Sequence, residues 1–231
     1  MSLSIRQVAT STADQASARE FFNQLIALFD LSNARALDMF ARTGELTVEN
    51  YKHAVSELHC WELAPEHKQT LIERHNPQSV IIGDSYLTAI QAIDRGEKYD
   101  LIVVDSPQGA HSDSACFVHY EHFDVVRSLL PEMVGEEALV VLYVNKKPYN
   151  KDELGSHGYD QYSEYDFAAW MAAREKFYGD KHITEEQAIS AYRSALSPWA
   201  TVEQVLVTPC HSDVPGYAPY AFRLGLRIKR K

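Results

Sequence analysis

The regular alternation of short apolar stretches with amphipathic ones constrains the fold of this chain more than any other feature. Five stretches have the composition of strands: 36–40, 59–63, 80–82, 99–104 and 138–144. The first four are followed by segments with helical spacing of apolar residues: 47–57, 65–75, 86–95 and 120–130. The run 99–104 is almost wholly apolar, as is typical of a strand buried on both faces. Together these patterns predict an α/β fold with a parallel sheet and right-handed crossovers.

The two ends of the chain extend this pattern. A helix is expected over 12–31, before the first strand, with Thr12 as its cap. Two further strands are expected over 202–208 and 221–228 with no helix between them. A parallel connection needs a long crossover, so this pair is predicted to be antiparallel and to close the sheet.

The stretch 146–200 is too long for an ordinary crossover. Helices are expected over 163–178 and 185–196, the second with Thr184 and Gln187 in a capping-box pattern. Long insertions are often functional, so we interpret this one as a helical cap over a ligand crevice. The alternative is that its helices pack on the flank of the sheet.

Length and composition suit a single domain over 1–231. About 45% of the 231 residues are hydrophobic, which is enough for a large core. No apolar run approaches the roughly 20 residues that a membrane helix needs. Residues 1–15 lack the basic-then-apolar pattern of a signal peptide. We therefore expect a cytoplasmic protein with no membrane partner.

Charge and cysteine content narrow the possible partners. The formal net charge of -10 disfavours nucleic acid, because phosphate contacts need clustered lysine and arginine. The three cysteines, Cys60, Cys116 and Cys210, are far apart, which argues against a disulfide framework or a zinc site. No metal site is predicted.

Carboxylates stand at or near the ends of the first four expected strands. They are Asp38, Glu62, Asp84 and Asp105, separated by 24, 22 and 21 residues, about one strand–helix unit each. Ligands of open α/β sheets bind beyond the carboxyl ends of the strands. Several acids at one edge of a buried sheet are costly unless something satisfies them. A ligand rich in hydroxyls and amines, such as an adenosine that carries an amino acid, would do so.

The motifs around these carboxylates resemble those of a known family. Residues 37–44 (LDMFARTG) look like motif I of class I methyltransferases that use S-adenosylmethionine (SAM), in the version D-x-F-x-G-x-G. Residues 60–62, 82–85 and 99–105 are similar to the family's acidic motif II, its motif III and its motif IV. The resemblance implies a mostly parallel, seven-stranded Rossmann-like sheet with helices on both faces and SAM as the cofactor.

The resemblance also implies roles for individual residues. The methionine part of SAM would be lined by Asp38, Phe40, Ala41 and Gly44. Glu62 would hold the ribose with Leu63 against the base, and Asp84 and Ser85 would face the adenine. Asp105 would lie near the methyl group. The family usually has glycine where Arg42 stands, and an arginine there would either block SAM or pair with a carboxylate.

The acceptor is less constrained than the cofactor. After the fourth strand comes Asp105-Ser106-Pro107, which lacks the first proline and the aromatic residue of the nucleic-acid amino methyltransferases. A small molecule with an O or N acceptor is therefore the leading hypothesis, with Asp105 and His111 as the catalytic pair and His111 as general base. Three alternatives are a spermidine synthase-like aminopropyltransferase, a nucleic-acid methyltransferase, and a degenerate SAM-binding or interaction module.

Overall fold

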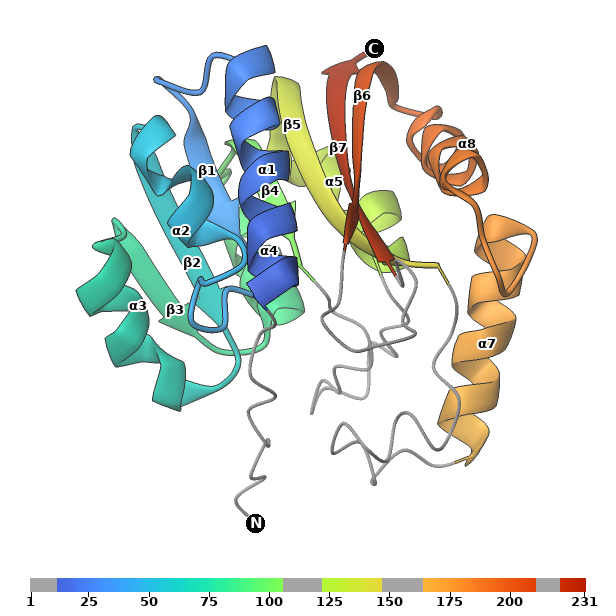
Figure 1. The fold of residues 1–231 in the computed structure, drawn as a ribbon, viewed down its shortest axis with the longest axis horizontal. Helices are drawn as coiled ribbons and strands as arrows, with labels where there is room; N and C mark the ends of the chain where they lie inside the picture. Colours follow the sequence, from blue (N-terminus) through green and yellow to red (C-terminus); the bar gives the residue numbers. More distant parts are fainter. Residues whose placement is uncertain (1–11, 106–121, 147–163, 211–220) are drawn as a thin grey trace.

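A seven-stranded mixed sheet forms the centre of the computed structural model, which describes residues 12–105, 122–146, 164–210 and 221–231 (Figure 1). The strand order is β3-β2-β1-β4-β5-β7-β6. The first five strands run parallel, and β7 lies antiparallel between β5 and β6. This confirms the predicted α/β class and the antiparallel pair at the end of the chain.

The strands cover nearly the stretches that the sequence predicts. Their bounds are β1 Arg35–Asp38, β2 Glu57–Glu62, β3 Ser79–Ile82, β4 Tyr99–Val104, β5 Val134–Asn145, β6 Ala200–Cys210 and β7 Ala221–Arg230. The last three are longer than expected, because backbone pairing between neighbours continues past the apolar residues that mark each core. The 3-2-1-4-5 order places the crossovers on both sides of β1, which opens a crevice at its carboxyl end.

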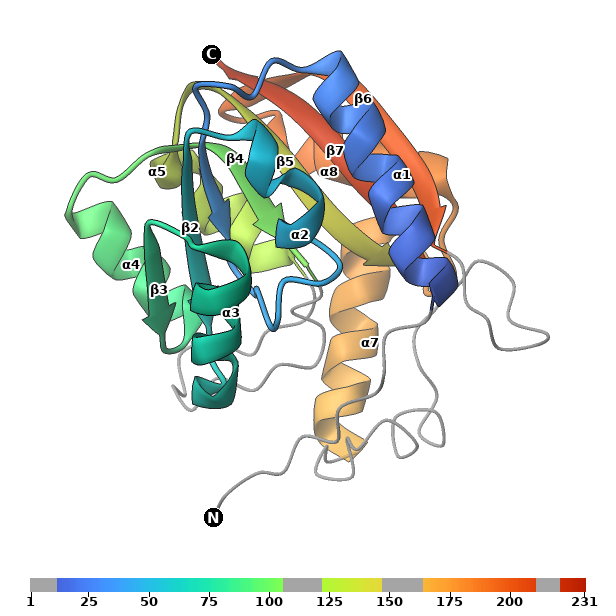
Figure 2. The same ribbon diagram turned by 60° about the vertical axis from the view of Figure 1, so that its left-hand side comes forward.

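Helices cover both faces of the sheet (Figure 2). On one face lie α1 Thr12–Leu28, α2 Val48–Tyr51 and α3 Lys68–His75, and their apolar side chains share a core with β1, β2, β4 and β5. On the other face lie α4 Ser85–Asp94, α5 Leu130–Met133 and α8 Glu185–Leu196. No helix in the described ranges is both long and apolar enough to cross a membrane.

The predictions of two helices are wrong in detail. The segment 47–57 forms only α2 and a 3-10 turn, Lys52–Ala54, and Thr47 makes no capping bond. The helix expected over 120–130 contains a π-helical turn, Val125–Leu129, before α5. Pro131 follows that turn and has no N–H for a bond to the preceding turn, so a widened turn accommodates it.

The insertion contributes α7 Glu164–Tyr178 and α8. Tyr178, Ile183 and Tyr192 are buried in the same core as the sheet, so α8 and the end of α7 pack on its flank. A role for 146–200 as a cap remains a prediction, because residues 147–163 lie outside the described ranges. The predicted capping box is confirmed: Gln187 N–H donates to Thr184 Oγ1 at 3.2 Å, and Thr184 N–H to Gln187 Oε1 at 2.8 Å.

We expect Thr184→Ala to lower the free energy of unfolding by about 1 kcal/mol, because the Gln187 N–H at the start of α8 loses the hydroxyl oxygen that accepts it. Urea unfolding followed by circular dichroism measures the change. Ser190→Ala, at an exposed position of the same helix, is the matched control and should not destabilise the protein. Equal loss in the two variants would contradict the capping role.

Candidate functional site

The loop after β1 turns sharply at Arg42 and at Gly44, whose φ angles are 47° and 75°. A Cβ on Gly44 would lie 2.5 Å from Nε2 of His75, so both space and conformation require glycine there. Arg42, at a position where the resemblance predicts glycine, adopts a left-handed conformation that glycine favours. That conformation costs an ordinary residue about 1–2 kcal/mol. Position 42 therefore has a conformation that suits glycine, although an arginine occupies it.

Asp38 is fully buried at the end of β1. Tyr51 Oη donates to its Oδ2 at 3.2 Å, whereas its Oδ1 has no hydrogen-bond partner that meets the distance and angle limits in the described ranges. Burial raises the pKa of Asp38 to about 7. The hydroxyl of Thr47 lowers that pKa, and the negative charge of Asp105 raises it further. A buried carboxyl with one unsatisfied oxygen is what a bound polar ligand would complete.

Glu62 ends β2, and each of its oxygens accepts a backbone amide. Oε2 accepts from Arg42 N–H at 2.6 Å and Oε1 from Ala64 N–H at 2.8 Å. Each carboxylate oxygen retains a second lone pair, so the predicted bonds to ribose hydroxyls remain chemically available. Leu63, the next residue, leaves 50% of its surface exposed. Its position suits the predicted contact with a flat base.

Asp84 caps α4, and its Oδ1 accepts from Tyr86 N–H at 2.9 Å. Its Oδ2 is buried and has no partner in the described part of the chain. Ser85 is buried, and its hydroxyl donates to the carbonyl oxygen of Met39 in the loop after β1. Both predicted adenine-facing residues therefore also have structural roles, since they fix the start of α4 beside that loop.

Asp105 follows β4 and lies above the same edge as Asp38, because Asp38 pairs with Val103 in the parallel register of β1 and β4. Burial raises its pKa to about 6, and the guanidinium of Arg223 is the largest influence in the opposite direction. At neutral pH most of this carboxyl is ionised, yet it can accept a proton. These properties suit a general base.

The structure thus brings the four predicted carboxylates to the carboxyl ends of the strands. Phe40, whose ring is tilted against that of Tyr86 with 5.9 Å between the ring centroids, and buried Ala41 lie in the loop that follows β1. His111, predicted as the general base, lies outside the described residues. A group of three or more possible metal ligands is absent from the described ranges.

The sequence analysis missed Arg223 and Asp14, which form an ion pair of 3.0 Å close to Asp105. Arg223 in β7 is 2% exposed, and its Nη1 also donates to Ser17 Oγ at 3.0 Å. The only signal in the sequence is an arginine within the apolar run of β7. Its partner is 209 residues away, so no local pattern could identify it.

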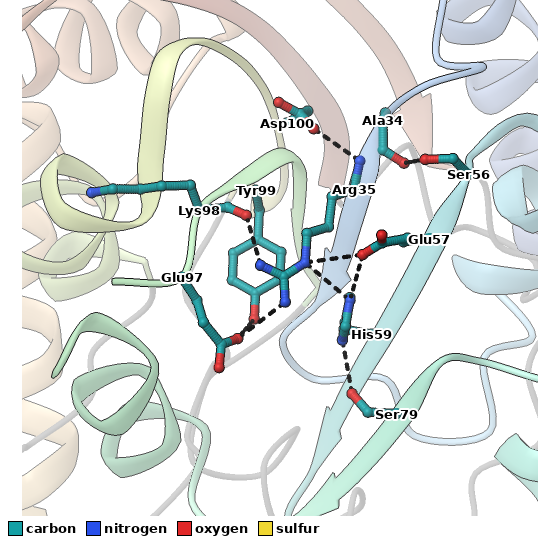
Figure 3. Close-up of polar contacts among 10 residues, drawn as sticks. All are labelled: Ala34, Arg35, Ser56, Glu57, His59, Ser79, Glu97, Lys98, Tyr99 and Asp100. Carbon is teal, nitrogen blue, oxygen red and sulfur yellow. Dashed lines mark hydrogen bonds and ion pairs between the residues drawn. The ribbon is translucent and has the colours of Figure 1, made fainter. Parts of the chain in front are cut away.

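A second polar cluster, around Arg35 and His59, lies near the amino-terminal ends of the strands (Figure 3). Arg35 Nε donates to His59 Nε2 at 3.2 Å, and its Nη2 reaches Glu97 Oε2 at 3.3 Å. His59 Nδ1 lies 2.8 Å from Ser79 Oγ, and burial lowers the pKa of His59. A neutral imidazole with its proton on Nδ1 satisfies both contacts. The cluster therefore links β1, β2 and β3 to the segment just before β4.

Neither a family model nor a curated protein matches the sequence. Solved structures share its fold at low identity. SMU.776, described as a methyltransferase and complexed with S-adenosylhomocysteine (SAH), has a TM-score of 0.52 at 16% identity over 94% of this chain and 49% of its own. A SAM-dependent methyltransferase from Streptococcus mutans gives 0.51 at 15% identity over 93% and 48%. The chain thus spans about half the length of these two.

Magnesium protoporphyrin IX methyltransferase from Synechocystis PCC 6803, with bound SAH, has a TM-score of 0.50 at 13% identity and covers 95% of this chain and 84% of its own. At such identities the likeness concerns the fold. The chain has the fold of the class I SAM-dependent methyltransferases, as the motifs predict.

We expect Arg42→Gly to be roughly 0.5–1 kcal/mol more stable than Arg42→Ala, because only glycine relieves the left-handed conformation and part of that gain is offset by unfolded-state entropy. Urea unfolding of both variants measures the difference, and the alanine variant controls for loss of the side chain. Equal stability of the two variants would show that position 42 is not strained.

We expect Asp38→Asn to become increasingly more stable than the parent chain as pH rises from 4.5 to 8. The folded-state pKa of about 7 lies above the unfolded value, so the parent loses stability as the carboxyl ionises over that window. The gain should reach a few kcal/mol, since each pKa unit corresponds to about 1.4 kcal/mol. Unfolding free energies at both pH values test this, and a constant difference would contradict a buried, ionisable Asp38.

Proposed function

We propose that the chain binds SAM over the carboxyl ends of β1 to β4 and transfers its methyl group to a small-molecule acceptor. The observation that carries the proposal is a pair of buried carboxylate oxygens, Asp38 Oδ1 and Asp84 Oδ2, which have no hydrogen-bond partner among the described residues. They lie at or just after the carboxyl ends of β1 and β3, the strands on either side of β2, which ends at Glu62. Buried polar atoms normally have partners, so these two indicate a ligand with several hydrogen-bond donors. The adenosine and the amino acid part of SAM supply such donors.

In this proposal the binding residues divide by strand. Asp38, Phe40, Ala41 and Gly44 hold the methionine part, Glu62 and Leu63 the ribose and the base, and Asp84 and Ser85 the adenine. When bound, SAM supplies a methyl carbon that a nucleophile attacks directly. The protein has two remaining tasks: it positions the acceptor, and it receives a proton from it. Asp105 and His111 are our candidates for the second task.

The charge distribution supports a small acceptor over a nucleic acid. The chain carries a net charge of -10, and Asp105 adds a carboxylate at the carboxyl ends of the strands. A phosphate backbone would be repelled there. Aminopropyl transfer would use the same site with decarboxylated SAM, so that donor separates the two reactions.

The first experiment is calorimetric titration of the purified protein with SAM and with SAH. We expect micromolar dissociation constants for both, followed by release of SAH when an acceptor is present. A folded protein that binds neither compound would contradict the proposal and would favour an interaction module.

We expect Leu63→Ala to weaken SAM binding threefold to tenfold, because it removes about 1 kcal/mol of apolar contact with the base. The side chain is half exposed, so stability should not change. Leu28→Ala is the matched control. Leu28 is 59% exposed at the end of α1, which runs opposite to β1 and places this residue at the far edge of the sheet (Figure 1). Equal affinity of the two variants would overturn the role of Leu63.

A further inference from the structure

The last turn of α3 contacts the loop after β1. The side chain of His75, which ends this helix, is fully buried, and its Nε2 lies 2.8 Å from the carbonyl oxygen of Thr43. A carbonyl oxygen can only accept a hydrogen bond, so Nε2 carries a proton and donates it. Beside it, Arg74 Nη1 donates to Glu45 Oε1 at 3.0 Å. Two consecutive side chains of α3 therefore hold the loop on either side of Gly44.

The bond from His75 fixes a peptide unit that lies outside the regular strands and helices. In the Thr43–Gly44 peptide the N–H donates to the carbonyl oxygen of Ala41 at 2.7 Å, and the C=O accepts from His75. A peptide unit is planar, so hydrogen bonds on its two opposite sides set its orientation. Loss of the imidazole would free the carbonyl side of this peptide.

The imidazole is itself held at both of its nitrogens. Its Nδ1 lies 3.4 Å from Lys52 Nζ and 3.2 Å from Glu49 Oε2, and Lys52 also donates to that oxygen at 3.1 Å. Burial lowers the pKa of His75, which favours a neutral ring with its proton on Nε2 and with Nδ1 as an acceptor from Lys52. A Cβ on Gly44 would lie 2.9 Å from Cδ2, so the ring also fills the space beside that glycine. Contacts on three sides therefore set the position of Nε2.

We propose, on the basis of the proposed SAM site, that His75 is a positioning residue for the loop after β1. Its Nε2–H holds the Thr43–Gly44 peptide in the orientation in which Gly44 lines the methionine part of SAM. Glu62 holds the same loop at Arg42 N–H, from the end of β2. The loop is thus fixed by two neighbouring elements before the ligand arrives. Less conformational entropy is then lost on binding, and the affinity for SAM rises.

The test compares two amide side chains of different reach. In His75→Gln the amide nitrogen is as many bonds from Cβ as Nε2 is, so it can donate to Thr43. In His75→Asn the amide nitrogen is closer to Cβ and cannot reach that carbonyl. We expect the asparagine variant to bind SAH about fivefold to tenfold more weakly than the parent chain, the ratio that one neutral hydrogen bond represents. The glutamine variant should stay within about twofold of the parent. Calorimetry measures both.

A second measurement does not depend on SAM. The Gly44 N–H donates to Ala41, so it exchanges with solvent only when this turn opens. We expect His75→Asn to raise its exchange rate about tenfold and His75→Gln to leave it near that of the parent chain. Urea unfolding of the same proteins separates this local effect from a loss of global stability.

Equal SAH affinity of the two variants would overturn the proposal, and so would equal exchange rates at Gly44. A parent chain that binds neither SAM nor SAH would contradict the proposed methyltransferase, and exchange at Gly44 would still decide whether His75 holds the loop. If His75→Asn does not fold, the parent chain decides, because long-range nitrogen–proton NMR spectra show which ring nitrogen is protonated. A proton on Nδ1 instead of Nε2 would rule out the bond to Thr43.

Discussion

The loops at the carboxyl ends of the strands depend on the hydrogen bonds of Glu62. Its carboxylate ties the loop after β1 to the end of β2 through Arg42 N–H and the next loop through Ala64 N–H. The carbonyl of the same residue accepts Gly83 N–H after β3. One residue therefore fixes the start of three loops, and in the part of the chain that the structure describes those loops carry most of the candidate site.

The two ends of the sheet use polar groups differently. At the amino-terminal edge, Arg35, His59 and Glu97 satisfy one another, so that cluster needs no ligand. At the carboxyl edge, Asp38 and Asp84 each keep one buried oxygen without a partner in the described ranges. An unsatisfied buried acceptor costs about 1–3 kcal/mol. For Asp38 and Asp84 that cost falls at the carboxyl ends of the strands, where the fold places a crevice and a ligand could supply the missing donors.

Sequence patterns predicted the strands well, because a strand buried on both faces needs an apolar run that local composition reveals. They predicted less about the helices. Thr47 was expected to cap a helix, but its hydroxyl accepts from no amide of that helix and instead donates to the buried carboxyl of Asp38, whose pKa it lowers. Asp84 and Ser85 were assigned to adenine, and the structure shows that they also fix α4 to the loop after β1. A sequence motif locates such residues along the chain, but it does not reveal which hydrogen bonds they make in the fold.

The sequence by itself determined the alternation of strand and helix and the one carboxylate per unit, since both are local patterns with a fixed period. Tertiary structure alone decided that β7 lies between β5 and β6 and so brings Arg223 beside Asp105. It also decided that Asp14, 209 residues before Arg223, neutralises that arginine. Such contacts join elements that are distant along the chain, and their strength comes from burial, which only the assembled fold creates.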